Sequence, residues 1–183
     1  MLTYRAEKNA ELLFSFPDGL SWNELDKQGV KLPVRMKFVD LVIEREQDIL
    51  LIEIKDPSHS QSQDRDRNTY LKRLSDNSVL TQELTPKARD SYLYLHLMER
   101  DNKPFKYVVL LGLDAFDPER QKALMFGFKD RLLADIREES FEAWKRKHIA
   151  DCVVLSVESW NQQFPEWQVR RETSVEVVKK AVQ

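Results

Sequence analysis

The sequence predicts an α/β protein, in which a mixed β-sheet forms the central layer of a three-layer sandwich and helices flank it. Three observations support this class. Residues 36–56 read as two β-strands joined by a short polar turn, which makes an antiparallel pair. The runs Lys106–Leu113 and Cys152–Val157 are almost continuously apolar, as in strands covered on both faces. Segments with helical spacing of apolar residues separate these strands, so the sheet is expected to be mixed.

The chain of 183 residues fits one domain with a sizeable core. Its net charge of -2 gives no global attraction to nucleic acid, so such binding would need a local basic surface. The sequence contains no apolar run that could span a bilayer and no signal-peptide pattern, which predicts a cytoplasmic protein without a membrane partner. Cys152 is the only cysteine, which excludes an intrachain disulfide and a cysteine-based zinc site.

The first segment, Tyr4–Phe16, predicts a helix, because its apolar residues fall near one face. Pro17 and Gly19 then oppose its continuation and indicate a turn. Residues 20–33 are expected to be irregular or to form a short helical turn. The strand pair follows, with strands over about 36–45 and 48–56.

The segment after this pair is polar and predicts a loop that runs into a short helix. Thr85 is expected to cap a helix that has Pro86 at its first position and ends near Arg100. The strand Lys106–Leu113 comes next. These elements, from about residue 4 to 114, form the predicted core.

The rest of the chain, about 115–183, is predicted to be a helical and strand extension of the core. Asp117 and Pro118 repeat the cap-then-proline pattern and begin a helical region to about residue 149, broken near residues 137–140. The strand at Cys152–Val157 follows, and Ser159 is expected to cap a short helix. From about residue 168 the chain is charged and is expected to fray or to form a final helix.

Three charged residues lie inside the otherwise apolar strand pair: Asp40, Glu53 and Lys55. Side chains alternate along a strand, so Glu53 and Lys55 point to the same face of the sheet. If Asp40 faces Glu53 across the sheet, the two carboxylates repel each other unless a cation neutralises them. Hard oxygen ligands of this kind suit Mg²⁺ or Mn²⁺.

Such a metal ion could activate a water and stabilise charge on a phosphoryl oxygen. Lys55 would then lie beside the metal, where it could hold or help deprotonate the attacking water, or stabilise the developing negative charge. The arrangement predicts a centre that hydrolyses phosphodiesters. The alternative is that Glu53 and Lys55 form an ion pair on a solvated face of the sheet.

Asp40 followed by Glu53-Ile54-Lys55 resembles the D…(D/E)-x-K signature of the PD-(D/E)XK nuclease superfamily, which has the restriction-endonuclease-like fold. The order of elements over somewhat more than half of the chain is also similar to the family core. The resemblance implies metal-dependent cleavage of DNA or RNA, with Asp40 and Glu53 as metal ligands and Lys55 as the catalytic lysine. It further implies an acid from the first helix, for which Glu11 fits better than Glu7. Val39 stands where the family name records a proline.

Six basic residues are candidates for contacts with nucleic acid: Arg65, Arg67, Lys72, Arg73, Lys87 and Arg89. The first four are in the polar segment after the strand pair, and the last two open the helix that begins near residue 85. Phosphate contacts use such residues. Acidic neighbours balance the first four, however, so a solvated loop is an equal alternative.

The predicted partner is nucleic acid, with DNA preferred, and a homodimer would be the simplest way to cut both strands of a duplex. The competing prediction is a catalytically inactive nuclease-like module that binds nucleic acid or a protein partner. The sequence has four glycines and no glycine-rich phosphate loop, which disfavours a nucleotide-driven enzyme.

Overall fold

The computed structural model describes residues 2–6, 10–26, 33, 35–139 and 144–172. Its centre is a five-stranded mixed sheet with the order β3-β4-β5-β6-β7. The strands are β3 (Trp22–Glu24), β4 (Leu41–Glu44), β5 (Ile49–Lys55), β6 (Phe105–Leu111) and β7 (Asp151–Ser156). The first three strands are antiparallel neighbours, whereas β5, β6 and β7 run parallel. The predicted mixed sheet is therefore confirmed.

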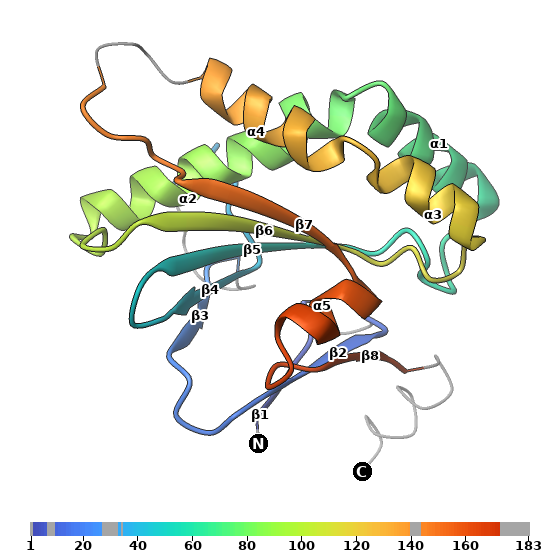
Figure 1. The fold of residues 1–183 in the computed structure, drawn as a ribbon, viewed down its shortest axis with the longest axis horizontal. Coiled ribbons are helices and arrows are strands. Elements are labelled where there is room, and N and C mark those ends of the chain that lie inside the picture. The colour runs from blue at the N-terminus through green and yellow to red at the C-terminus, as the bar shows by residue number, and fades with distance from the viewer. Residues whose placement is uncertain (1, 7–9, 27–32, 34, 140–143, 173–183) are drawn as a thin grey trace.

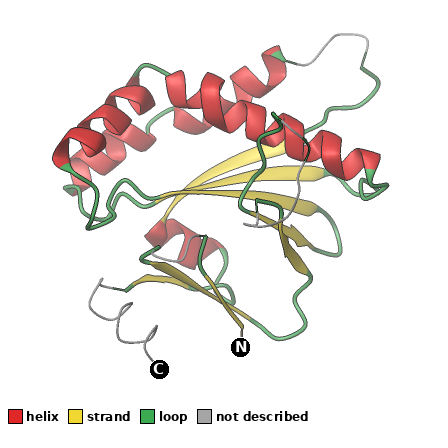
Figure 2. Ribbon diagram, turned by 180° about the vertical axis from the view of Figure 1, so that it is seen from behind, coloured by secondary structure: helices red, strands yellow, loops and turns green. Residues whose placement is uncertain are grey.

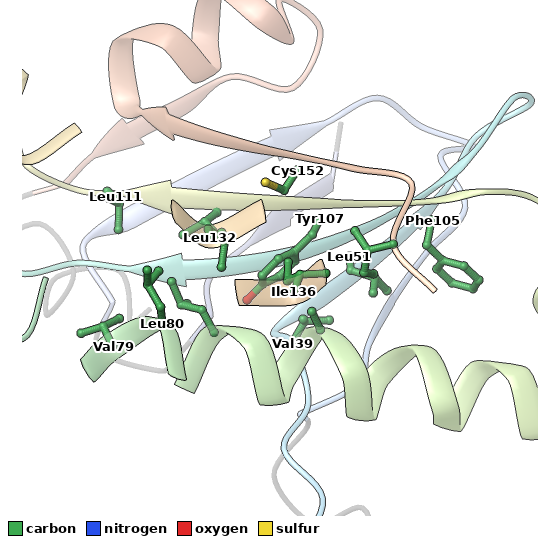
Figure 3. Packing of buried hydrophobic residues seen from close by; sticks show 14 of the residues in the cluster. Val39, Leu51, Val79, Leu80, Phe105, Tyr107, Leu111, Leu132, Ile136 and Cys152 are labelled. Atoms are coloured by element: carbon green, nitrogen blue, oxygen red, sulfur yellow. The ribbon is translucent and has the colours of Figure 1, made fainter. Parts of the chain in front are cut away.

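A layer of helices covers one face of this sheet (Figure 1). The layer contains α1 (Asp64–Ser75), the π-helical turn η1 (Leu80–Leu84), α2 (Thr85–Leu97), α3 (Pro118–Met125) and α4 (Phe128–Glu138). Figure 3 shows side chains such as Val39, Leu51 and Tyr107 gathered between the strands and the helices. This apolar layer is the larger of the two cores and fixes the helices on the sheet.

The opposite face is covered by a second, smaller sheet and one short helix (Figures 1 and 2). The small sheet has the order β1-β2-β8 and is antiparallel. Its strands are β1 (Leu2–Tyr4), β2 (Leu12–Phe16) and β8 (Val169–Arg171), and the helix is α5 (Val157–Gln163). Phe14, Phe16 and Trp160 lie in this core against Leu50 and Ile52 of β5. Three layers are thus present. One outer layer is helical, whereas the other consists of the small sheet and α5.

The predicted helix over Tyr4–Phe16 is wrong for the residues that the structure describes there. They form β1 and β2, and residues 7–9 lie outside the described residues. Leu12–Phe16 pairs with β1 on one side and with β8, more than 150 positions later in the chain, on the other. These long-range strand contacts and the burial of Phe14 and Phe16 outweigh the local preference for helix.

Several predicted helix boundaries also need correction. Thr85 is not an N-cap, because its backbone is already helical and continues from η1. The region that begins at Pro118 is broken at Gly127, whose φ of 64° is left-handed. Its predicted end near residue 149 is wrong, since residues 144–150 contain no helix and residues 140–143 lie outside the described part.

The C-terminal expectations are met in part. Ser156, rather than Ser159, is the N-cap of α5, and the two residues form a capping box. Residues 169–171 form β8, and residues 173–183, where a final helix was one expectation, lie outside the described residues. Within the described ranges, no helix is long and apolar enough to cross a membrane.

Candidate functional site

The hairpin of β4 and β5 brings Asp40 and Glu53 side by side. Leu41 pairs with Ile52 in an antiparallel register, so Asp40, one residue before β4, lies next to Glu53. The Asp40 carboxylate also accepts a hydrogen bond of 2.7 Å from the backbone N–H of Ile54. Because Ile52 and Ile54 face the small-sheet core, Glu53 between them faces the helical layer.

Two lysines contact the Glu53 carboxylate, which is almost completely buried. Lys55 Nζ lies 3.0 Å from Glu53 Oε1. Lys87 Nζ, from the first turn of α2, lies 2.8 Å from Oε1 and 2.9 Å from Oε2 of the same carboxylate. It is also 3.9 Å from Asp40 Oδ1, so a single ammonium group reaches both acids. The Lys87 ammonium therefore lies near both carboxylates.

A third acid, Glu83, extends this charge network. Its carboxylate lies 3.0 Å from Lys55 Nζ and 2.5 Å from Arg73 Nη2. Glu83 comes from η1, and single π-helical turns occur often at functional sites. Sequence reasoning missed this residue, because no local pattern indicates the π-turn that brings Glu83 to Lys55.

The pKa values of Asp40 and Lys55 are both raised, but burial acts on the two groups in opposite directions. Burial, and then the neighbouring Glu53 carboxylate, raise the pKa of Asp40 to about 7. Burial alone would lower the pKa of Lys55, but the carboxylates of Glu53 and Glu83 raise it above its ordinary value. Lys55 is therefore held as an ammonium ion at neutral pH.

Asp40, Glu53, Lys55 and Lys87 line a polar cavity of about 620 Å³. Five acids and two lysines lie along its wall: Asp26, Asp40, Glu53, Asp56, Asp66, Lys55 and Lys87. The excess of acids makes the cavity favourable for a cation and unfavourable for a phosphate group that arrives without one.

Glu11, the further acid that the resemblance implied, contacts Arg171 and Ser60. It lies just before β2, is 2% exposed, and its Oε2 accepts a hydrogen bond of 2.9 Å from Arg171 Nη1. The backbone N–H and the hydroxyl of Ser60 also donate to it. The helix that was expected to carry Glu11 is absent from the described residues. The role of Glu11 as a metal ligand stays a prediction.

The donors at Asp40 and Glu53 suit a hard divalent cation, because both are carboxylates and both reach one cationic group. Glu53 Oε1 is buried and receives no hydrogen bond of good geometry from the described residues, although two ammonium groups lie near it. In the described part of the chain, no group of three or more His, Cys, Asp or Glu residues is arranged around a metal position. A metal at this pair would therefore complete its coordination with water or substrate oxygens.

The six predicted nucleic-acid contacts divide into three kinds. Arg65 and Lys72 are exposed on α1 and form no ion pair with a described residue. Arg67 donates to the backbone carbonyl of His59 and lies 3.5 Å from Asp64. The other three, Arg73, Lys87 and Arg89, are held by carboxylates of the protein itself.

Comparisons of the chain with protein-family models, with curated proteins and with solved structures found no match. The function of the chain must therefore be inferred from the geometry and charge of this site.

Proposed function

We propose that the chain is a Mg²⁺-dependent nuclease of the PD-(D/E)XK type, which hydrolyses phosphodiester bonds of DNA or RNA. The observation that carries the proposal is the arrangement of Asp40, Glu53 and Lys55. The hairpin brings the two carboxylates within reach of one cation, Lys55 contacts the second carboxylate, and all three line one polar cavity. Burying such charges in apolar strands costs free energy that a purely structural role does not explain.

Each residue has a distinct role in this proposal. Asp40 and Glu53 hold the metal ion, which would act as a Lewis acid and lower the pKa of a bound water. Lys55 stabilises negative charge on the phosphoryl oxygen, because its ammonium is held in the charged form by Glu53 and Glu83. Of its two predicted roles, this one is favoured over that of a proton acceptor. DNA is the proposed first substrate, and a symmetric dimer would cut both strands.

The order of elements supports the proposal from β4 onward. A strand hairpin with the acids is followed by helices and by β6, which pairs with β5 in parallel. The described N-terminal residues depart from the family pattern, because they form strands where the family core has a helix. The restriction-endonuclease-like fold is therefore proposed for the part of the chain that begins at the hairpin.

A second candidate function is a catalytically inactive module that binds nucleic acid or a protein partner. For such a module, the charge of the cavity favours a protein partner over nucleic acid, since acids outnumber lysines along the wall and repel phosphates. Arg73 and Arg89, which were expected to contact phosphate, are already paired with carboxylates. Such a module would bind its partner without cutting it.

Incubation with plasmid DNA, single-stranded DNA and RNA, in Mg²⁺, in Mn²⁺ and in EDTA, tests the proposal. We expect cutting that depends on the metal and that falls by about 10²-fold or more in Asp40→Asn and Lys55→Ala. Lys106→Ala is the matched control, because Lys106 also pairs with a buried acid, Asp48, but lies outside the cavity. If Asp40→Asn cuts nucleic acid as fast as wild type in the presence of the metal, the assignment of the active site is wrong. Binding of nucleic acid without cutting in any metal would support the inactive module.

A further inference from the structure

Lys87 occupies an unusual position for a residue expected to contact substrate. Its ammonium lies between the two proposed metal ligands, 2.8 and 2.9 Å from the oxygens of Glu53 and 3.9 Å from Asp40. Its side chain is only 15% exposed. Lys87 contacts both carboxylates, whereas the other lysine of the site, Lys55, contacts Glu53 and Glu83.

We propose that Lys87 is an internal cation that holds the metal position in the metal-free protein and competes with the divalent ion for Asp40 and Glu53. The inference rests on the proposed function and deepens it. A divalent cation and an ammonium group cannot both lie within contact distance of the same carboxylate oxygens without strong repulsion. Metal entry therefore requires the Lys87 ammonium to leave the pair.

The cavity provides the place for the displaced ammonium. Lys87 lines this cavity itself, so its flexible side chain can turn into it without rearrangement of α2. The wall of the cavity also carries Asp26, Asp56 and Asp66, which offer other acidic neighbours. In that position the ammonium is available to a phosphate of the substrate, which reconciles the predicted role of Lys87 with its observed contacts.

The competition has a consequence for the strength of metal binding. The free energy of the Lys87 contacts is lost when the metal enters, so the wild-type protein binds the ion more weakly than the carboxylates alone would allow. Removing the charge of Lys87 should therefore strengthen metal binding, whereas removing a charge that supports the metal would weaken it. The sign of the change separates this role from a structural one.

Titration calorimetry with Mn²⁺ alone, at about pH 8 so that the carboxylates are ionised, measures this sign. We expect Lys87→Met to bind Mn²⁺ at least about tenfold more tightly than wild type, and Lys87→Arg to remain close to wild type. Lys106→Met is the control, because it removes a lysine from buried Asp48 outside the cavity and should leave the affinity unchanged. Asp40→Asn should weaken the binding of Mn²⁺ both in the wild-type protein and in Lys87→Met.

Thermal unfolding provides a second measurement. In EDTA, Lys87→Met should unfold at a lower temperature than wild type, because Glu53 loses its closest partner. Mn²⁺ should then raise the unfolding temperature of Lys87→Met more than that of wild type. If Lys87→Met does not fold, Lys87→Gln replaces it, since the amide keeps a hydrogen-bond donor for Glu53 without the charge.

The outcomes distinguish the inference from the proposed function. Binding of Mn²⁺ by wild type, with equal or weaker binding by the uncharged Lys87 variants, would overturn the competition alone. No binding of Mn²⁺ by wild type or by any Lys87 variant would overturn the proposed function and the competition with it.

Discussion

At the scale of single residues, the protonation state of Asp40 is coupled to folding in a pH range that includes neutrality. Its pKa is about 7 in the folded protein because of burial and the adjacent Glu53, against an ordinary value of 3.8. Between these values the folded protein holds a proton that the unfolded chain has released. The free energy of unfolding of the metal-free protein should therefore fall as the pH rises through this window.

Asp40→Asn removes this dependence while keeping an acceptor for the N–H of Ile54. We expect the metal-free variant to be more stable than wild type above about pH 7, by on the order of a few kcal/mol, because no buried group then has to ionise at this position. Urea unfolding in EDTA across about pH 5 to 8 measures the effect. An unchanged pH dependence in Asp40→Asn would show that another group is responsible.

Asp48 provides a comparison of opposite sign. It is 1% exposed, and although burial raises its pKa, hydrogen bonds from Arg45 and Lys106 lower it below the ordinary value. Its stabilising contribution is therefore present above the unfolded-state pKa of about 3.8 and is lost as the pH falls below it. Asp48→Asn should destabilise the protein at neutral pH, by about 3 kcal/mol if Arg45 is left without its partner. The same urea titration detects it, and equal stability would contradict this account.

At the scale of elements, the turn from η1 into α2 places both Glu83 and Lys87 at the site. Pro86 cannot donate a hydrogen bond to the carbonyl of Gln82, and Lys37 Nζ donates to that carbonyl instead, at 2.6 Å. The hydroxyl of Thr85 donates to Asp135 on α4. These contacts explain how a proline is accommodated within a continuous run of helix.

Glu83→Gln tests whether this turn positions Lys55. The variant removes one of the two carboxylates that hold the ammonium. We expect a stability loss of about 1 kcal/mol, since the group is partly exposed, together with a fall of about tenfold in kcat without a change in KM. Urea unfolding measures the stability, and steady-state cleavage measures the kinetic constants.

The control for this variant is Glu119→Gln, which removes a carboxylate from an exposed pair with Lys122 on α3. It should change neither quantity. If Glu83→Gln behaves like Glu119→Gln, then Glu83 does not position Lys55.

The elements also show what the sequence could and could not predict. The strands β5, β6 and β7 were predicted because each is a local run of apolar residues, and the pairing of Asp40 with Glu53 follows from their spacing in one hairpin. β2 was missed because one of its partners, β8, is remote in sequence, and β1, which pairs with β2, was missed with it. Glu83 and the exact placement of Lys87 depend on a π-turn that leaves no periodic signature.

At the scale of the whole molecule, Arg171 joins the two sheets beside the site. It follows Arg170 on β8, and its guanidinium contacts the carboxylates of Glu11, Asp56 and Asp114. Asp56 follows directly on Lys55, the last residue of β5. Arg171 therefore ties the end of the strand that carries Glu53 and Lys55 to the small sheet on the opposite face.

The backbone at Gly112 packs closely against the ion pair between Asp56 and Arg171. A Cβ on Gly112, which follows β6, would lie 2.5 Å from Asp56 Oδ1 and 3.2 Å from Arg171 Nη2. Gly112→Ala should therefore cost about 1–3 kcal/mol of stability, as overpacking does in well-packed interiors. Chemical denaturation measures the loss. A variant as stable as wild type would show that the side chains of Asp56 and Arg171 can move away from the added methyl group without loss of stability.

Arg171→Gln tests whether the two sheets depend on this one side chain. Three carboxylates would lose their shared cation, and Glu11 is almost fully buried, so we expect a loss of about 3 kcal/mol or more. Hydrogen exchange should accelerate in β2, β8 and the end of β5 before it does in β6. Arg170→Gln is the matched control, because the neighbouring Arg170 is 63% exposed and pairs only with Glu172 among the described residues; it should lose about 0.5 kcal/mol or less. Equal stability and equal exchange in the two variants would mean that apolar packing alone holds the small sheet against β5.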